Sequence, residues 1–360
     1  MKKILGIVAA VSASLILAGC GGEPRSPANT VAAAYVDIDK AIFNVKDVVE
    51  VVIDELPKEM REEAEKAYEE AIEQYKKNFR CFDVEWAVAT VGMDKSSPEP
   101  APAIVVKADL KAKNEQGATL VDMLRGFVGG QASQVAGAPA LTCVLPGLGR
   151  STLAFVDDTY VIAVAASSAG VLERMVKLYK DGDGETSDAF DDLTDLDGDT
   201  VLRVQTADAA TMADLFGCRR EIEEFGEKCG DEDLAEMLLD VGGVMLDVKV
   251  TDDVLGSTLT VDAGSDLFAD AVEGAANIAV LGNRIAAAGA GSSAEVIEKA
   301  LRKVGTVEMG VLKKLGGSLG GLLRKAVEVK RSGSTVTLAV EFDTEDLVET
   351  VVPALTGAAR

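Results

Sequence analysis

The sequence predicts an α+β fold of two tandem similar halves, each an antiparallel sheet of hairpins with helices packed on one face. Short apolar strands come in pairs separated by tight turns, segments with a helical apolar stripe lie between the pairs, and this order recurs. Hairpins build antiparallel sheets, and amphipathic helices need a sheet face to cover. Because the 360 residues are 48% hydrophobic but only 4% aromatic, we expect an aliphatic core.

We expect the first half to cover residues 30–180. A strand at 30–37 precedes a helix that Asp39 caps, and Pro57 ends that helix. The further expected elements are a helix over 58–79, strands at 84–92 and 103–110, a helix near 119–127, an irregular Gly- and Pro-rich stretch over 129–150, strands at 152–156 and 159–166 around Asp157-Asp158, and a helix over 169–179.

We expect the second half, residues 200–360, to repeat this order. It opens with a strand at 200–205, and Asp208 again precedes a helical run. The further expected elements are a helical stretch over 219–239, a hairpin of 244–251 and 255–262, helices over 266–282 and 293–323, a hairpin of 327–330 and 335–341, and a helix over 345–355. Gene duplication would explain the recurrence, but two halves could also share this plan without common descent.

Between the halves, residues 181–199 hold nine acidic residues and no basic one. A dense charge run of this kind is typical of a solvated linker. Carboxylate oxygens are also calcium ligands, which makes Asp181, Asp183 and Glu185 weak calcium candidates. The EF-hand spacing fails, because Thr186 stands where the sharp turn needs glycine. We therefore predict a linker, with no metal and no cofactor.

The first 19 residues have the pattern of an export signal. Lys2 and Lys3 are followed by an apolar run from Ile4 to Leu17, which is too short to span a bilayer. Leu17-Ala18-Gly19-Cys20 comes next, with small residues directly ahead of a cysteine. The alternative is an ordinary secretory signal followed by a chance cysteine.

This segment resembles the lipobox signal of bacterial lipoproteins. The resemblance covers about 20 residues and implies cleavage between Gly19 and Cys20, with lipid attached to Cys20. Residues 20–29 are rich in Gly and Pro, so we expect a flexible tether. Because Gly21 rather than Asp follows Cys20, the resemblance favours the outer membrane, facing the periplasm, over the inner membrane. The remaining chain resembles uncharacterised exported proteins with repeated hairpin–helix units.

Charge and composition exclude several function classes. The net charge is −24, and removal of residues 1–19 with their two lysines makes it −26. A field of this sign repels nucleic acid and anionic lipid headgroups. We therefore expect no nucleic-acid partner, and membrane attachment through the lipid rather than through a basic patch. The chain has no histidine, which excludes His-dependent triads, general bases and metal ligands.

Four cysteines follow Cys20, and an even number in an exported protein suggests disulfides. We predict a Cys218–Cys229 bridge, because the residues between them could form a short helix that folds back at Gly226. That choice leaves Cys81 to pair with Cys143. The alternative is four buried free thiols.

We therefore expect a lipid-anchored, non-enzymatic envelope protein that binds a protein partner or an apolar ligand through a sheet face or groove. One alternative is a carrier of an apolar ligand or lipid, since aliphatic residues are abundant around 264–323. Another is a hydrolase that uses carboxylates only, which would require an Asp or Glu with a raised pKa in a cleft.

Overall fold

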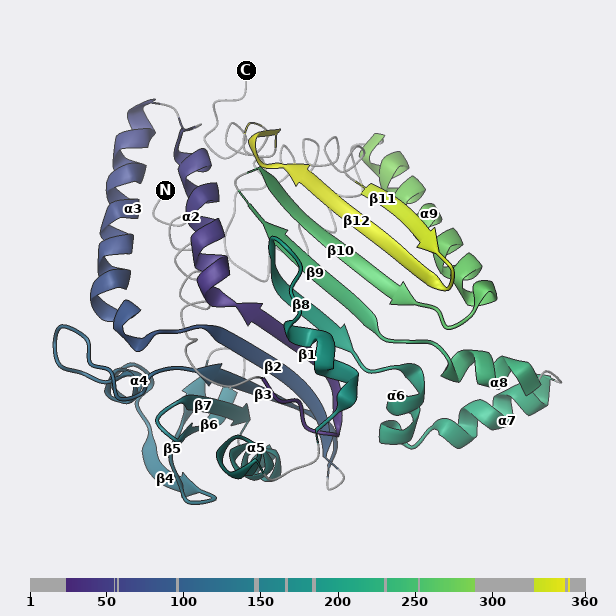
Figure 1. Ribbon diagram of the computed structural model, residues 1–360, viewed down its shortest axis with the longest axis horizontal. Helices are drawn as coiled ribbons and strands as arrows, with labels where there is room; N and C mark the ends of the chain where they lie inside the picture. Colours follow the sequence, from purple (N-terminus) through teal and green to yellow (C-terminus); the bar gives the residue numbers. More distant parts are fainter. Residues whose placement is uncertain are drawn as a thin grey trace. The chain divides into compact units, whose positions relative to one another are not determined.

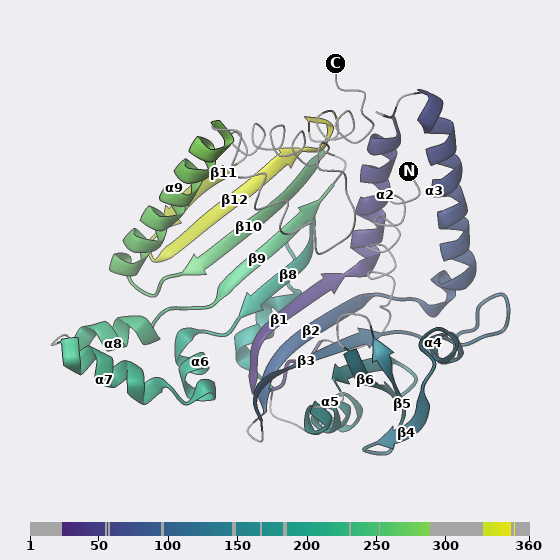
Figure 2. The same cartoon turned by 180° about the vertical axis from the view of Figure 1, so that it is seen from behind.

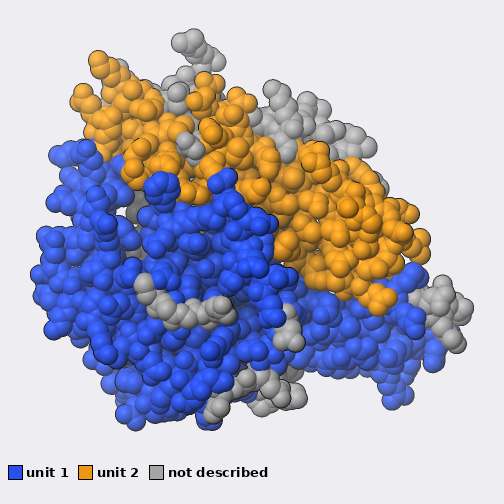
Figure 3. Space-filling view, in the orientation of Figure 1, with its two compact units in different colours: residues 1–43, 66–239 blue, residues 44–65, 240–360 orange. Residues whose placement is uncertain are grey.

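The computed structural model describes residues 24–54, 56, 58–94, 97–145, 149–165, 168–182, 186–229, 232–251, 253–288, 327–346 and 349. Its fold is α+β with antiparallel strand pairing, as expected (Figure 1). The contacts divide the chain into two compact units, which Figure 3 colours separately. Unit 1 comprises residues 1–43 and 66–239, and unit 2 comprises residues 44–65 and 240–360.

The strands of unit 1 lie in the order β8-β1-β2-β3-β7-β6-β5-β4, each antiparallel to its neighbours (Figures 1 and 2). Their bounds are β1 Thr30–Asp37, β2 Trp86–Asp94, β3 Ser97–Lys107, β4 Gln131–Val135, β5 Ala138–Leu145, β6 Gly149–Val156, β7 Tyr160–Ala165 and β8 Thr200–Thr206. The hairpin expected around Asp157-Asp158 is confirmed, and both residues have positive φ, as a tight two-residue turn requires.

Two expected helices are present, α2 Ile38–Asp54 and α3 Lys58–Asn78, and both are divided between the units, because residues 44–65 belong to unit 2. The others are η1 Arg80–Phe82, α4 Leu120–Val128, α5 Ala169–Asp181, η3 Asp188–Thr194, α6 Ala209–Phe216, α7 Arg219–Cys229 and α8 Glu232–Leu239. Thr119 caps α4, and its side chain and that of Asp122 form a capping box. Asp208 caps α6 as expected, accepting a hydrogen bond from the Thr211 N–H at 2.7 Å.

Part of the unit 1 sheet is covered on both faces, so the expectation of helices on one face is wrong there. Alternate residues of β7 belong to two different cores: Ile162 and Val164 pack with α5, whereas Val161 and Ala163 pack with Leu120 of α4. The reason is the unbroken apolar run in β6 and β7, which leaves no polar side for water.

Unit 2 contains a sheet in the order β11-β12-β10-β9. Its elements are β9 Val244–Val250, β10 Val254–Asp262, α9 Asp266–Ala288, β11 Val327–Ser332 and β12 Thr335–Asp343. The two expected hairpins are confirmed. The helix expected over 293–323, and most of the one over 345–355, lie outside the described residues.

The expectation that residues 129–150 are irregular is wrong: the described residues of this stretch include β4, β5 and the start of β6. Ala136 and Gly137 have φ values of 46° and 79° and make the two-residue turn between β4 and β5. Small residues alternate inward along β5, where Ala138 and Ala140 are buried. This buried side is made of alanine rather than Val or Ile, which is why strand propensity did not reveal it.

The acidic stretch 181–199 does not separate the compact units, which divide between residues 239 and 240. Phe190 and Leu193 of η3 are buried in the α5 core. The buried Arg203 side chain of β8 donates to the backbone oxygens of Asp192 and Asp195, at 2.8 and 2.9 Å. Phe190, Leu193 and the Arg203 contacts therefore hold residues 190–195 against the rest of unit 1.

Candidate functional site

The segment that follows the lipobox pattern is docked on unit 1. The Arg25 N–H donates to the Tyr179 hydroxyl at 2.8 Å, and that hydroxyl donates back to the Arg25 carbonyl at 3.0 Å. The Arg25 guanidinium donates to the Leu178 carbonyl at 3.1 Å, at the end of α5. Arg25 itself is exposed, whereas Ser26 and Tyr179 are buried.

Further contacts hold the next residues. The Ser26 carbonyl accepts from the Ser187 N–H at 2.9 Å, and Pro27 forms a bridge with Thr186. Asn29 bonds with Met93 twice: its carbonyl accepts from the Met93 N–H at 2.9 Å, and its side-chain amide donates to the Met93 carbonyl. The flexible tether expected over 20–29 is therefore wrong for residues 25–29, since the body supplies partners for their backbone.

Tyr179 belongs to a row of aromatic rings. Its ring centroid lies 5.0 Å from that of Tyr160, and Tyr160 lies 6.2 Å from Trp86. Burial raises the pKa of Tyr179 well above its ordinary value. The hydroxyl therefore stays protonated and keeps the hydrogen that it donates to Arg25.

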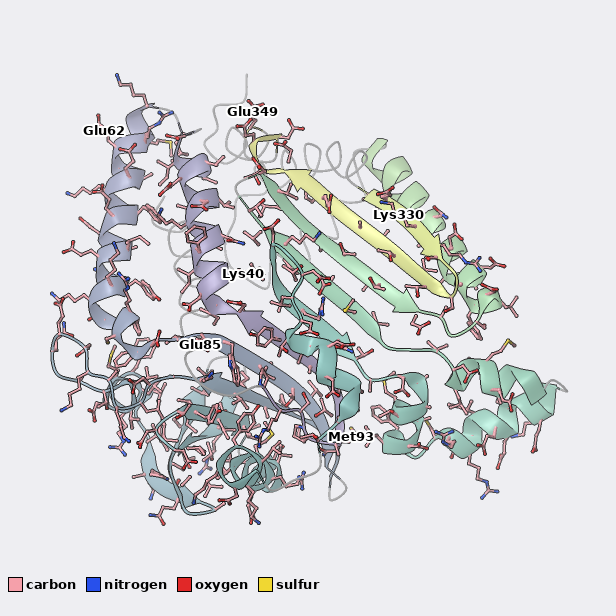
Figure 4. The ribbon with its side chains drawn as sticks, in the orientation of Figure 1. Lys40, Glu62, Glu85, Met93, Lys330 and Glu349 are labelled. Carbon is pink, nitrogen blue, oxygen red and sulfur yellow. The ribbon has the colours of Figure 1, made fainter. Side chains whose placement is uncertain are left out.

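At the other end of this row a buried lysine pairs with a partly exposed carboxylate. Lys107 Nζ lies 3.2 Å from Glu85 Oε2, and their side chains are 3% and 38% exposed. The same ammonium lies 5.7 Å from the centroid of the Trp86 ring, within cation–π range. Glu85 directly precedes β2 (Figure 4), so the start of that strand brings the pair together.

Carboxylates gather around this pair. Burial, and then the charges of Asp37, Asp83 and Glu85, raise the pKa of Asp39. Burial and the charges of Asp37 and Glu85 also raise the pKa of Tyr35 to about 12. Asp37 accepts from the Lys40 N–H at 2.9 Å at the start of α2, whereas Asp39 lies inside the first turn. The expectation that Asp39 caps this helix is therefore wrong. Among the described residues, no group of three or more His, Cys, Asp or Glu side chains is arranged to hold a metal ion.

The expected Cys218–Cys229 disulfide is wrong. The helix α7 runs unbroken from Arg219 to Cys229, without the expected turn at Gly226. Eleven residues at 1.5 Å each separate the two Cα atoms by about 16 Å, whereas a disulfide needs less than about 7 Å. Cys218 is a free thiol.

Cys81 and Cys143 are also free thiols, so the expected bridge between them is absent from the structure. They do lie in the same apolar cluster, where Cys143 is buried beside Leu141 and Cys81 packs against its edge. Burial raises the pKa of both thiols. A neutral thiol in an apolar cluster behaves as a small hydrophobic side chain, which is the alternative that the sequence left open.

The unit 2 sheet has one apolar face. Directly opposed residues of an antiparallel sheet share a face, and the register aligns Leu246 with Leu259 and Leu259 with Leu338. The residues of this face are Val244, Leu246, Val248, Val250, Leu255, Ser257, Leu259, Val261, Val336, Leu338, Val340, Phe342, Val327, Val329 and Arg331. All are partly exposed except Val336, which is buried.

A single helix supplies the described packing on this apolar face. Ala269, Phe268 and Val272 of α9 form a small cluster with Val336 and Val329. Arg331 pairs with Asp266 at 2.8 Å and with Asp270, which ties β11 to the start of α9. Within the described residues, α9 thus covers the part of the face on β11 and β12.

The other predicted site residues lie apart from these features. Gly19, Cys20, Asp183 and Glu185 are outside the described residues. Asp181 is the exposed last residue of α5, beside Lys177. No described helix has both the length and the apolar character needed to cross a membrane.

No family model and no curated protein matches the chain. Solved structures of TP0453 align with the chain at 7% sequence identity. Crystal form III has a TM-score of 0.40, and crystal form I has one of 0.36; in both cases 92% of this chain aligns with 98% of the other.

Replacing Tyr179 with Phe should release the docked N-terminal segment. The variant keeps the packed ring but loses both hydrogen bonds to the Arg25 backbone, so we expect a cost of about 1–2 kcal/mol in free energy of unfolding. Amide hydrogen exchange of residues 25–30 should accelerate. Tyr75→Phe on α3 is the matched control; equal exchange of that segment in the two variants would show that the tyrosine does not hold it.

Replacing Glu85 should cost more stability than replacing Lys107. Glu85→Gln leaves a buried ammonium without its carboxylate, so we expect a loss of about 2–3 kcal/mol. Lys107→Met keeps the buried volume and leaves Glu85 able to turn to water, so the loss should be smaller or absent. Urea unfolding measures both. Lys111→Met, which breaks an exposed pair with Asp158, is the control, and equal losses for Glu85→Gln and Lys107→Met would contradict the asymmetry.

Proposed function

We propose that this chain is a lipid-anchored envelope protein that acts by binding rather than by catalysis. The supporting observation is the order of two features along the chain. The lipobox pattern ends at Cys20, and the body holds the chain from Arg25 onward. A folded body that begins so soon after a lipidated cysteine suits a protein that works at a membrane surface. On the lipobox resemblance, we place it on the outer membrane, facing the periplasm.

For the binding surface we propose the apolar face of the unit 2 sheet. Its aliphatic side chains lie in register across four strands and stay partly exposed. Contiguous exposed apolar surface is a common mark of a binding site. A protein partner could bury it, and so could an acyl chain between the sheet and α9, which is the carrier alternative.

A carboxylate hydrolase is the remaining alternative, and one observation favours it. The pKa of Asp39 is raised beside Asp37, Asp83 and Glu85, and such a shift is a feature of general acids. Burial of Asp39 at the start of α2 and the charges of the nearby carboxylates are enough to raise its pKa without a catalytic role. Glu85, one of these carboxylates, is paired with the buried Lys107, which favours a structural role for the cluster.

We also propose that the two halves derive from one duplicated unit. In unit 1 the hairpin β2–β3 is followed across the sheet by β7 and then β6. In unit 2 the hairpin β9–β10 is followed by β12 and then β11. Each hairpin comes after a strand and a helical segment, and β4 and β5 are then an addition to the first copy.

Lipidation is tested by growing cells with labelled fatty acid. The wild-type chain should incorporate label into its N-terminal peptide and fractionate with membranes. Cys20→Ser should lose both properties, because serine offers no thiolate for the lipid donor. Cys218→Ser controls for the general effect of losing a thiol. Equal labelling and fractionation of wild type and Cys20→Ser would refute the anchor.

The binding surface is tested by a photo-crosslinking amino acid placed at position 259, with position 258 on the opposite face as the matched control. We expect adducts at 259 well above those at 258. A protein adduct supports a binding module, and an acyl-chain adduct supports the carrier. Equal yields at the two positions, in variants whose circular dichroism matches that of wild type, would contradict use of this face.

A further inference from the structure

We propose that the exposed side of α5, together with Arg25, rests on anionic lipid headgroups when the chain is anchored. This inference rests on the proposed lipidation of Cys20 and adds the orientation of unit 1 at the membrane. Two independent observations support it: the place where the N-terminal segment docks, and the charge of the helix on which it docks.

The first observation concerns distance. Arg25 is fixed to the carboxyl end of α5 through Leu178 and Tyr179. Five residue steps lead from Cys20 to Arg25, and a fully extended chain covers at most about 3.6 Å per residue, or about 18 Å here. A lipid on Cys20 therefore keeps the end of α5 within about 18 Å of the bilayer surface.

The second observation concerns charge. The chain is strongly acidic, yet α5 is the one described α-helix with a net positive charge: Arg174, Lys177 and Lys180 stand against Glu173 and Asp181. These side chains are exposed, as is Arg25. The buried side of α5 carries its apolar residues, from Val171 to Tyr179, toward the sheet. The cations thus lie on the side of the helix away from the core.

The proposed contact does not require the rest of the acidic chain to attract anionic lipid. Salt screens exposed charges beyond about 8 Å under physiological conditions, so distant acids contribute little at the α5 surface. Because only five residue steps separate Cys20 from Arg25, a lipid on Cys20 also keeps α5 at a high effective concentration beside the headgroups. Arg25 and the three cations of α5 exceed Glu173 and Asp181 by two positive charges on this surface. That excess can set the orientation of unit 1, while the acyl chains supply the affinity.

Lysine footprinting of the acylated protein tests this orientation. A membrane-impermeant acetylating reagent is applied to protein on phosphatidylcholine vesicles with and without phosphatidylglycerol. We expect Lys177 and Lys180 to react several-fold more slowly with phosphatidylglycerol present, and to recover at high salt. Lys66 and Lys228 are matched controls, because each is exposed and pairs with a glutamate on its own helix, as Lys177 does. Their reactivity should not change.

Charge reversal gives a second readout. Lys180→Glu should weaken the protection of Lys177, whereas Lys66→Glu should leave it intact. Equal reactivity of Lys177 and the control lysines on anionic vesicles, or protection that spreads evenly over all of them, would overturn the proposal.

The two proposals can fail separately. The acyl group on the N-terminal peptide is measured in the same sample, and its absence refutes lipidation of Cys20. In that case a chain that starts at residue 20 with a histidine tag is held on nickel-chelating lipid in the same vesicles. Selective protection of Lys177 and Lys180 there still supports the headgroup surface, and its absence there refutes it.

Discussion

The described part of unit 1 depends on the pairing of β1 with strands on both sides. β1 pairs with β2 over Ala32–Asp37 and again at Thr30, after one irregularity, and it pairs with β8 over Ala32–Val36. A strand that is satisfied on both edges cannot shift register without moving every side chain to the opposite face. This fixes Tyr35 in the α5 core and places Ile38, the start of α2, where its N–H donates to the Glu85 carbonyl at 2.9 Å.

The same strand links the two features of greatest functional interest. The docked N-terminal segment runs directly into its first residue, Thr30, which is fully buried. Asp37 is its last residue and Asp39 lies in the first turn of α2, where the charge of Glu85 helps to raise the pKa of Asp39. Because β8 pairs with β1, the acidic stretch before β8 is also drawn onto unit 1, where Phe190 and Leu193 enter the core. One central strand thus explains why a charge-rich segment is part of a folded unit.

Local features could be read from the sequence, and long-range ones could not. Sequence reasoning predicted the Asp157-Asp158 turn and the Asp208 cap of α6, because each depends on a few adjacent residues. The Thr119 cap of α4 is equally local and could have been predicted in the same way. The Arg25–Tyr179 contact joins residues 154 positions apart, and no local sequence pattern predicts it. The strands of 129–150 were missed because buried alanines carry little strand preference. The prediction of a Cys218–Cys229 bridge was wrong because the residues beside Gly226 favour a helix, and α7 continues through this glycine.

The docked segment changes what a lipid anchor can do. A free ten-residue tether would let the body rotate, and its end would wander over a root-mean-square distance of about 17 Å in every direction. A connection of five residues that ends in three hydrogen bonds to α5 would instead keep the end of α5 close to the membrane. Acyl chains bind by burying apolar surface and are insensitive to salt, whereas four exposed cations act through charge and are screened by it. If Cys20 is lipidated and α5 contacts the headgroups as proposed, affinity and orientation come from different forces. An acidic protein can then stay on an anionic surface while presenting a small basic patch to it.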